Sequence, residues 1–214
     1  GDATFSSSGG QDVQVAYVGD NTFAGNITIN SNKVVFNTST GKVTFTGTNN
    51  QTLNGTYNYP FKKLVINKTA GNVTANTTLS VDDSLIFIQG NLITTSTNLL
   101  TMKASSVASG ASNSSFVSGP IKKVGNTSFD YPLGGNGNYK KLSISAPGNV
   151  TDAFTAQYFS SGIYQNEPKD VSLNYVAKNY YWEVNRNTGS SNVYVYLSWN
   201  DIEPVVDTNI VRIA

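Results

Sequence analysis

Cysteine and histidine are both absent from this chain of 214 residues. Without cysteine the chain can form no disulfide bond, no zinc thiolate site and no thiol nucleophile. Without histidine it lacks the commonest general base and the commonest metal ligand. Ser-His-Asp and Cys-His catalytic arrangements are therefore excluded, and we expect a protein that is not an enzyme.

Charged residues are also scarce. They make up 13% of the chain, and 14 basic residues nearly balance 13 acidic ones. A groove that follows a phosphate backbone needs a stronger positive field, so we expect no nucleic-acid partner. No run of 18 apolar residues occurs, so we expect no insertion of a helix into a membrane. The polar surface must come mainly from neutral Asn, Thr and Ser side chains.

An apolar pattern with helical spacing is missing as well. Short β-branched and aromatic runs alternate instead with Gly, Asn and Ser-Thr clusters, which predicts an all-β fold. In the first half the expected strands are Val13–Val18, Asn26–Ile29, Lys33–Phe36, Val43–Thr46, Leu64–Ile66, Leu85–Ile88 and Leu99–Met102. In the second half they are Phe116–Val124, Ser128–Tyr131, Tyr139–Ser145, Phe154–Phe159, Tyr180–Asn185, Asn192–Ser198 and Asn209–Ile213.

The first half contains internal repeats. Gly1–Phe5 matches Gly41–Phe45 at an offset of 40 residues, and Ile27–Asn30 matches Leu64–Asn67 at an offset of 37. These matches indicate that one structural unit recurs along the first half of the chain.

A shorter step of 21 residues separates the apolar clusters at Val43, Leu64 and Leu85. A step of about 20 residues is typical of one coil of a β-solenoid, in which stacked coils share one core. We therefore predict that residues 1–113 form a right-handed parallel β-solenoid. A sandwich with regular strand spacing is the alternative.

The second half, residues 114–214, has longer and more aromatic strands, separated by turns such as Gly134–Gly137. Val193–Leu197 alternates with a period of two, as a strand with one buried face does. These features predict an antiparallel β-sandwich of the immunoglobulin-like or jelly-roll-like kind. We expect this domain to cap the solenoid, whose open end would otherwise expose unpaired strand edges.

Several motifs follow one another in a specific order. In the first half they are Gly41–Gly55, Leu64–Asn67, Val73 and Leu79. In the second half they are Ser118–Gly125, Tyr131–Gly134, Phe154–Tyr158, Tyr181–Val184 and Leu197–Trp199. Together they resemble the repeat-containing, adhesin-like surface and secreted proteins of gliding bacteria that are exported by type IX secretion.

The resemblance implies an extracellular location, at the bacterial cell surface, with neighbouring domains in the same polypeptide. It implies no catalytic residues. We expect a structural or adhesive segment of a large surface protein, which spaces and presents contact surfaces. The alternative is a carbohydrate-binding module attached to a secreted enzyme or adhesin. A polysaccharide or another surface ligand is the expected kind of partner.

Aromatic side chains offer one candidate binding site. Tyr57, Tyr59 and Phe61 share a face if their segment is extended, and stacked aromatic rings are how a sugar platform is built. Burial of the same rings in the core is the alternative. Trp182 and Trp199, in contrast, are expected to belong to the core of the sandwich.

Calcium is the one cofactor that the acidic residues suggest. Asp201, Glu203 and Asp207 form a cluster of hard oxygen ligands, although the chain has no Asp-x-Asp-x-Asp-Gly loop. A solvated loop is the alternative for this cluster, and we expect no other cofactor.

A carboxylate pair for glycoside hydrolysis could come from Asp82 with Asp83, or from Glu183 with Asp201 and Glu203. Adjacent residues on a strand point to opposite faces, so Asp82 and Asp83 would not face one substrate. We place these two residues in a turn.

The segment Asp83-Ser84-Leu85 fits the Asp-Ser/Thr-apolar pattern that bacteria of the resembling group use to O-glycosylate exported proteins. The resemblance therefore implies a glycan on Ser84.

Overall fold

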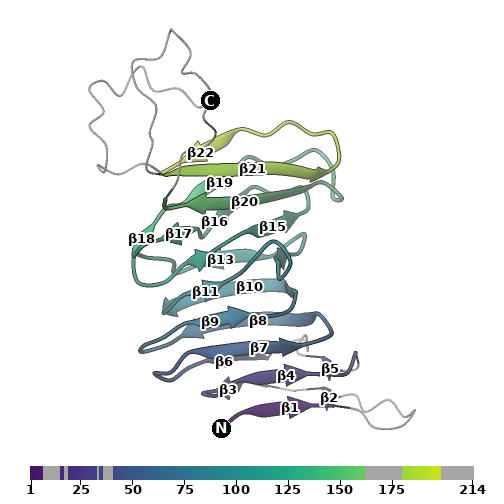
Figure 1. Cartoon of the computed structure of the whole chain (residues 1–214). Helices are drawn as coiled ribbons and strands as arrows, with labels where there is room; N and C mark the ends of the chain where they lie inside the picture. The colour runs from purple at the N-terminus through teal and green to yellow at the C-terminus, as the bar shows by residue number, and fades with distance from the viewer. Residues whose placement is uncertain (7–14, 17–18, 33, 36–40, 162–179, 199–214) are drawn as a thin grey trace.

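Strands are the only regular secondary structure in the part of the chain that the structure describes. This computed structural model describes residues 1–6, 15–16, 19–32, 34–35, 41–161 and 180–198. The all-β prediction is confirmed for these residues. The strands wind as a β-solenoid of about five turns, which Figure 1 shows as a stack of coils rising from the N-terminal strand.

Two sheets form the walls of the solenoid, because successive strands along the chain alternate between them. The six-stranded sheet is parallel and consists, in spatial order, of β1 (Ala3–Phe5), β4 (Ile27–Ile29), β7 (Gln51–Gly55), β9 (Val73–Ala75), β11 (Leu92–Ile93) and β14 (Val117–Ser118). The nine-stranded sheet consists, in spatial order, of β21 (Tyr181–Thr188), β20 (Ala153–Phe159), β15 (Ile121–Val124), β12 (Leu100–Met102), β10 (Leu79–Gln89), β8 (Tyr59–Asn67), β6 (Lys42–Phe45) and β3 (Asn21–Phe23), with β13 (Val107–Ser109) paired to β10 beside this path.

Three small sheets complete the strands of the described residues. The antiparallel three-stranded sheet consists of β16 (Phe129–Tyr131), β19 (Leu142–Ile144) and β22 (Val195–Leu197). The two pairs are the antiparallel β17 (Gly134–Gly135) with β18 (Asn138–Tyr139) and the parallel β2 (Val15–Ala16) with β5 (Val34–Val35).

The predicted step of 21 residues is confirmed in the nine-stranded sheet. Val43 lies opposite Leu64, and Leu64 lies opposite Leu85, so equivalent residues of successive coils stack on one another. Each coil buries its apolar residues against the same residues of the next coil, which a single coil could not do alone.

The longer offsets of 40 and 37 residues do not relate equivalent positions. Gly1–Phe5 leads into the six-stranded sheet, whereas Gly41–Phe45 leads into the nine-stranded sheet opposite Gly19–Phe23. Likewise Ile27–Asn30 and Leu64–Asn67 fall in different sheets. The interpretation of these two matches as whole repeats is wrong, because they compare one wall of a coil with the other.

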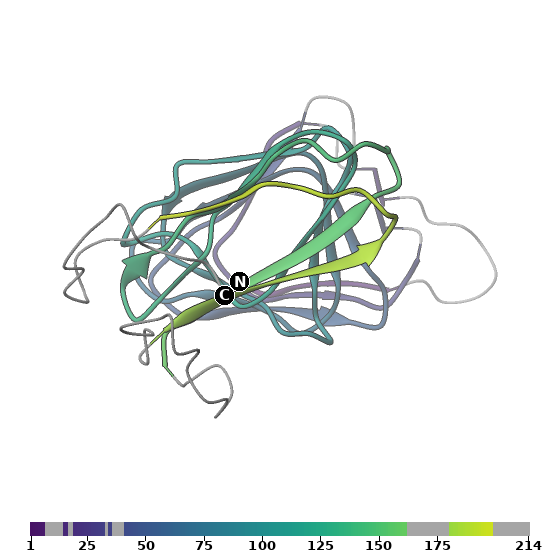
Figure 2. The same ribbon diagram turned by 90° about the horizontal axis from the view of Figure 1, so that it is seen from above.

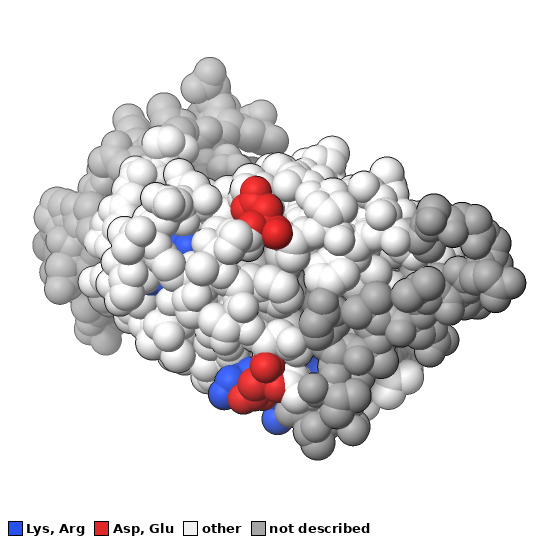
Figure 3. Space-filling view, turned by 90° about the horizontal axis from the view of Figure 1, so that it is seen from below, with Lys and Arg blue, Asp and Glu red and all other residues white. Residues whose placement is uncertain are grey.

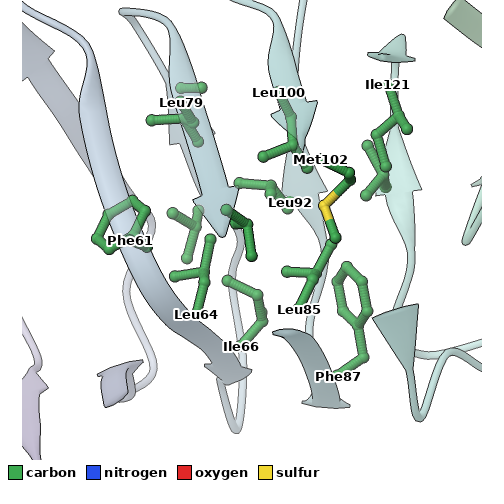
Figure 4. Packing of buried hydrophobic residues seen from close by; sticks show 14 of the residues in the cluster. Phe61, Leu64, Ile66, Leu79, Leu85, Phe87, Leu92, Leu100, Met102 and Ile121 are labelled. Atoms are coloured by element: carbon green, nitrogen blue, oxygen red, sulfur yellow. The ribbon is translucent and has the colours of Figure 1, made fainter. Parts of the chain in front are cut away.

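The core fills the space between the walls. In β6, Val43 and Phe45 are buried while Lys42 is exposed, so the alternation of the strand sends every second side chain inward. Figure 4 shows the inward side chains of successive coils stacked in continuous contact. The labelled members are Phe61, Leu64, Ile66, Leu79, Leu85, Phe87, Leu92, Leu100, Met102 and Ile121.

The parallel sheets continue across residue 113, where we placed a domain boundary. Strands β14 and β15 extend both walls beyond that point. The strand direction changes one step later, between β15 and β20, where Lys122 lies opposite Thr155 in an antiparallel pair. Figure 2 shows β20 and β21 running obliquely across the outline of the coils. The expected antiparallel strands are therefore present in the C-terminal part, but the larger sheet is continuous with the solenoid.

Asparagine side chains connect the coils at one corner. The Asn26 Oδ1 atom accepts a hydrogen bond from the backbone N–H of Thr52 at 2.8 Å, one coil further on. Asn50 accepts in the same way from the backbone of Asn72 at 2.9 Å, and Asn91 accepts from the backbone of Phe116. The neutral amides of this sequence thus satisfy backbone donors at positions where the strands begin.

Candidate functional site

Polar side chains inside the solenoid form the first notable cluster. Gln51 is buried at a corner, and its amide nitrogen donates to the backbone oxygens of Phe23 and Gly25, at 3.0 and 2.6 Å. Its amide oxygen accepts from the Lys68 ammonium at 2.6 Å, and that ammonium also donates to the Thr46 backbone oxygen at 2.9 Å. Burial lowers the pKa of Lys68. This relay joins three successive coils from within, so we assign it a structural role.

Lys123 fills a second internal position. Its ammonium donates to the backbone oxygens of Lys103, Ala104 and Ser106, at 2.7, 2.9 and 2.8 Å. It also lies 5.0 Å from the centre of the Phe129 ring. Burial lowers the pKa of Lys123 to about 8, so the side chain still carries its proton at neutral pH. A charged side chain therefore closes the turn of the preceding coil.

A shallow groove of about 330 Å³ crosses the outer face of the nine-stranded sheet. Its lining residues are Ser96, Leu99, Pro120, Thr155, Gln157, Glu183, Asn185 and Asn187. Four of them form two pairs across β20 and β21, since Thr155 lies opposite Asn185 and Gln157 lies opposite Glu183. The register of these two strands thus brings amide, hydroxyl and carboxylate groups onto one outward face.

The chemistry of this groove is hydrogen bonding. Thr155 donates to the Asn187 side chain at 2.6 Å, and the Asn185 amide donates to the Glu183 carboxylate. Among the described residues that line the groove, Glu183 is the only carboxylate. Glycoside hydrolysis uses two carboxyl groups on either side of the bond, and the partners we considered for Glu183 lie outside the described residues. The groove is suited to polar contact, with Leu99 and Pro120 as its apolar side.

The predicted aromatic platform of Tyr57, Tyr59 and Phe61 is not formed. Tyr59 and Phe61 are 0% exposed, and their rings pack in the core with centres 6.0 Å apart. The Tyr59 hydroxyl donates to the Ile27 backbone oxygen at 3.1 Å, and burial raises the pKa of Tyr59. The shared face of this strand is its inner face, so the prediction of a sugar platform is wrong for these two residues. Tyr57, at 41% exposure, remains at the surface.

Ser84 lies within β10, where it pairs with Lys63 of β8 and Val107 of β13. Its side chain is only 9% exposed. The folded chain therefore offers a modifying enzyme little access to this hydroxyl, and modification of Ser84 would have to precede folding. The implied glycan stays a prediction.

Asp82 and Asp83 belong to the same strand, in place of the turn that we predicted. The register shifts between Val81 and Ser84, so the two aspartates form a bulge on β10. Asp83 makes an exposed ion pair with Lys63 at 3.6 Å. A bulge accommodates the extra residue without ending the strand, which the sequence pattern does not reveal.

The predicted calcium ligands Asp201, Glu203 and Asp207 lie outside the described residues, as does Trp199. Within the part of the chain that is described, no group of three or more acidic residues could hold a metal ion. The same part contains no helix long and apolar enough to cross a bilayer. Trp182, which we expected in the core, is partly buried and packs against it, and its indole N–H donates to the Lys140 backbone oxygen at 3.2 Å.

Comparisons with known proteins give no relative: no family model, no curated protein and no solved structure matches the chain. The resemblance to exported surface proteins of gliding bacteria therefore rests on the motifs alone. Sequence reasoning missed the groove, because its lining comes from β20, β21 and two earlier turns that only the fold brings together. The available signal was the row of outward polar residues at alternate positions in β20 and β21.

Proposed function

We propose that this chain is a structural and adhesive segment of an extracellular bacterial surface protein, in which it acts as a stiff spacer that presents contact faces. The observation that carries the proposal is the uninterrupted stack of coils. Each wall passes from strand to strand by backbone hydrogen bonds, from β1 to β14 in one sheet and from β3 to β15 in the other. Such a stack resists bending, because every coil is tied to its neighbours along both walls.

Side-chain bonds between coils support the same role. The side chains of Asn26 and Asn50 join coils at a corner, and the Gln51–Lys68 relay joins them from inside. Gln51 and Lys68 are buried, and leaving either without a partner costs free energy, so the relay favours one arrangement of the coils over others. A spacer must keep a single arrangement of its coils along its whole length.

The exterior offers mainly uncharged hydrogen-bonding groups for contact with a partner. Figure 3 shows the N-terminal end, where few charged atoms interrupt the uncharged surface that is described. The ion pairs that do occur are exposed, as in Lys42 with Asp20 at 3.1 Å and Lys141 with Asp130 at 3.3 Å. Exposed pairs of this kind contribute little to stability, because water and salt screen them. Attachment to a surface would then depend on hydroxyl and amide groups.

We propose further that the solenoid is right-handed and that the C-terminal part is a β-sandwich that caps it. Right-handed crossovers between parallel strands are the strong general rule. The sandwich is supported by contact between β20 and the three-stranded sheet, since the Tyr131 hydroxyl of β16 donates to the Phe154 backbone oxygen of β20 at 2.9 Å. Both sheets contribute buried residues to one apolar cluster.

Export by type IX secretion and a position at the cell surface belong to this proposal through the resemblance of the motifs. A spacer role also agrees with neighbouring domains on the same polypeptide. The second candidate function, a carbohydrate-binding module, is favoured by a separate aromatic surface on the three-stranded sheet.

Single-molecule pulling tests the spacer proposal directly. The full chain is held by its two ends and extended, with a helical spacer of equal contour length as the matched control. We expect abrupt rupture steps at forces well above those of the control, because forced unfolding must break the coil-to-coil ladders together. Gradual extension at the force of the helical control would overturn the proposal.

A further inference from the structure

The outer face of the three-stranded sheet carries the two most exposed aromatic side chains of the described residues. Tyr194 is 75% exposed and Tyr196 is 60% exposed. Tyr196 belongs to β22 and Tyr194 directly precedes that strand. Their neighbours Val193, Val195 and Leu197 pack against the core, so the alternation over 193–197 turns both tyrosines outward. Two positions along a strand are about 7 Å apart, so the two rings stand side by side on one face.

Hydrogen-bonding groups lie next to these rings. The register aligns Asp130 of β16 with Ser143 of β19, and Ser143 with Tyr196 of β22, in one outward row. Ser143 donates to the Asp130 carboxylate at 2.6 Å, and Lys141 lies 3.3 Å from the same carboxylate. The positive and negative charges offset each other, which leaves a polar face without a net charge of either sign.

The strand at Tyr194 is held in place. The backbone N–H of Tyr194 donates to the Ser145 hydroxyl at 3.0 Å, and the backbone N–H of Ser145 donates to the Tyr194 oxygen at 2.9 Å. The ring of Tyr194 is therefore presented by a fixed backbone, which lowers the entropy that a ligand would have to remove.

A hollow of about 210 Å³ opens at the other end of the row. Asp130, Pro132 and Tyr139 line it together with residues 108–111. Burial and the nearby Asp130 carboxylate raise the pKa of Tyr139, so its hydroxyl remains a donor at neutral pH. The volume is below the roughly 300 Å³ at which sites for drug-sized ligands begin, so the hollow suits one small ring or the end of a chain.

We propose that the Tyr194–Tyr196 face, defined as Tyr194, Tyr196, Ser143, Lys141 and Asp130 with the adjoining hollow, binds a linear neutral polysaccharide. Aromatic faces stack on the apolar faces of sugar rings, and hydroxyl and carboxylate groups beside them accept and donate to sugar hydroxyls. The balanced charges favour a neutral polymer over an anionic one. This inference names the contact partner of the proposed adhesive segment and rests on that function.

Affinity electrophoresis of the full chain tests the inference, with hydroxyethylcellulose, xylan or laminarin in the gel as neutral probes and alginate as the anionic probe. We expect retardation by at least one neutral probe. The double variant Tyr194→Ala/Tyr196→Ala should bind that probe about tenfold more weakly, which corresponds to the loss of about 1.4 kcal/mol. Tyr194→Phe/Tyr196→Phe keeps the rings and should retain most of the binding.

Tyr57→Ala is the matched control, since it removes an exposed tyrosine from the solenoid and should change nothing. Circular dichroism of each variant verifies folding. Absence of retardation by every neutral probe overturns the proposal, as does undiminished binding by the double alanine variant. Retardation by alginate alone, lost in high salt, would also overturn it. The pulling experiment does not depend on these tyrosines, so failure here leaves the spacer role standing.

Discussion

Glycines at the coil corners carry backbone conformations that other residues avoid. Gly55, at the end of β7, has a φ of 135°, and a Cβ atom there would lie 1.9 Å from the Ile29 backbone oxygen of the previous coil. Gly55→Ala should therefore destabilise the fold by about 3 kcal/mol, from backbone strain and the clash together. Urea unfolding followed by circular dichroism measures the change.

Gly137 gives the control for this substitution. Its φ is 73°, but nothing lies within 4 Å of the position that an alanine methyl group would take, so Gly137→Ala carries only the cost of the backbone conformation, about 1 kcal/mol. Equal losses in the two variants would show that the close approach of the coils at Gly55 contributes nothing.

The buried ammonium of Lys123 makes the stability depend on pH. Burial lowers its pKa in the folded chain to about 8, against 10.5 for an exposed lysine. Between these two pH values the unfolded chain binds more protons than the folded chain, so the free energy of unfolding rises with pH. The stability of the native chain relative to Lys123→Met should therefore be constant below pH 8 and increase from pH 8 to about 10.5.

Urea unfolding of both proteins at pH 7, 8, 9 and 10 measures that difference. The methionine variant cancels the titration of every other group, because only the lysine is missing. A difference that falls with rising pH would mean that the three backbone oxygens around Lys123 outweigh its burial, and would contradict the prediction.

At the scale of elements, the Gln51–Lys68 relay couples the ends of strands from neighbouring coils. Lys68→Met removes a donor from two oxygens inside the solenoid. Gln51→Met leaves the Lys68 ammonium with one acceptor, the Thr46 oxygen, and takes one donor away from each of two backbone oxygens. Each single variant should lose about 3 kcal/mol. The double variant should lose clearly less than the sum, by at least about 1 kcal/mol, because the partners disappear together.

A double-mutant cycle from urea unfolding measures this coupling. Lys42→Met serves as the comparison, since Lys42 makes an exposed ion pair with Asp20 and its loss should leave the urea midpoint almost unchanged. Additive losses in the Gln51 and Lys68 variants would contradict the relay.

The sequence predicts the strands of one wall of the solenoid better than the strands of the other wall. The nine-stranded sheet repeats large apolar residues every 21 positions, and that step is visible as Val43, Leu64 and Leu85. The strands Gln51–Gly55 and Val73–Ala75 were missed, because they are short and rich in Asn, Thr and small residues. The sequence of the nine-stranded sheet therefore indicated the coil length, while the sequence of these strands in the six-stranded sheet resembled loops.

The candidate surfaces were harder to predict than the coils, because a pattern of alternation does not tell which face is buried. Tyr59 and Phe61 alternate like Tyr194 and Tyr196, yet the first pair lies in the core and the second pair at the surface. The difference comes from the sheet against which each strand packs. The groove around Glu183 was equally hard to predict, because it depends on the antiparallel register of β20 and β21.

At the scale of the whole molecule, the two predicted domains share their interior. One apolar cluster contains buried residues of the solenoid, such as Ile27 and Leu64, and buried residues of the C-terminal strands, such as Ile144 and Tyr158. The nine-stranded sheet also passes without interruption from β3 to β21. Two units that share a sheet and a core have no surface along which they could separate without exposing apolar area to water.

The chain should therefore unfold in a single cooperative transition, although its solenoid consists of repeats that could in principle unfold one at a time. The two tryptophans, Trp182 and Trp199, both belong to the C-terminal part, so their fluorescence follows that part while far-ultraviolet circular dichroism follows all strands. We expect the two signals to change at the same urea concentration, and the calorimetric and van't Hoff enthalpies to agree. If fluorescence changed first, the C-terminal strands would be a separate cap whose loss leaves the coils folded, and the shared core would not bind the two parts into one unit.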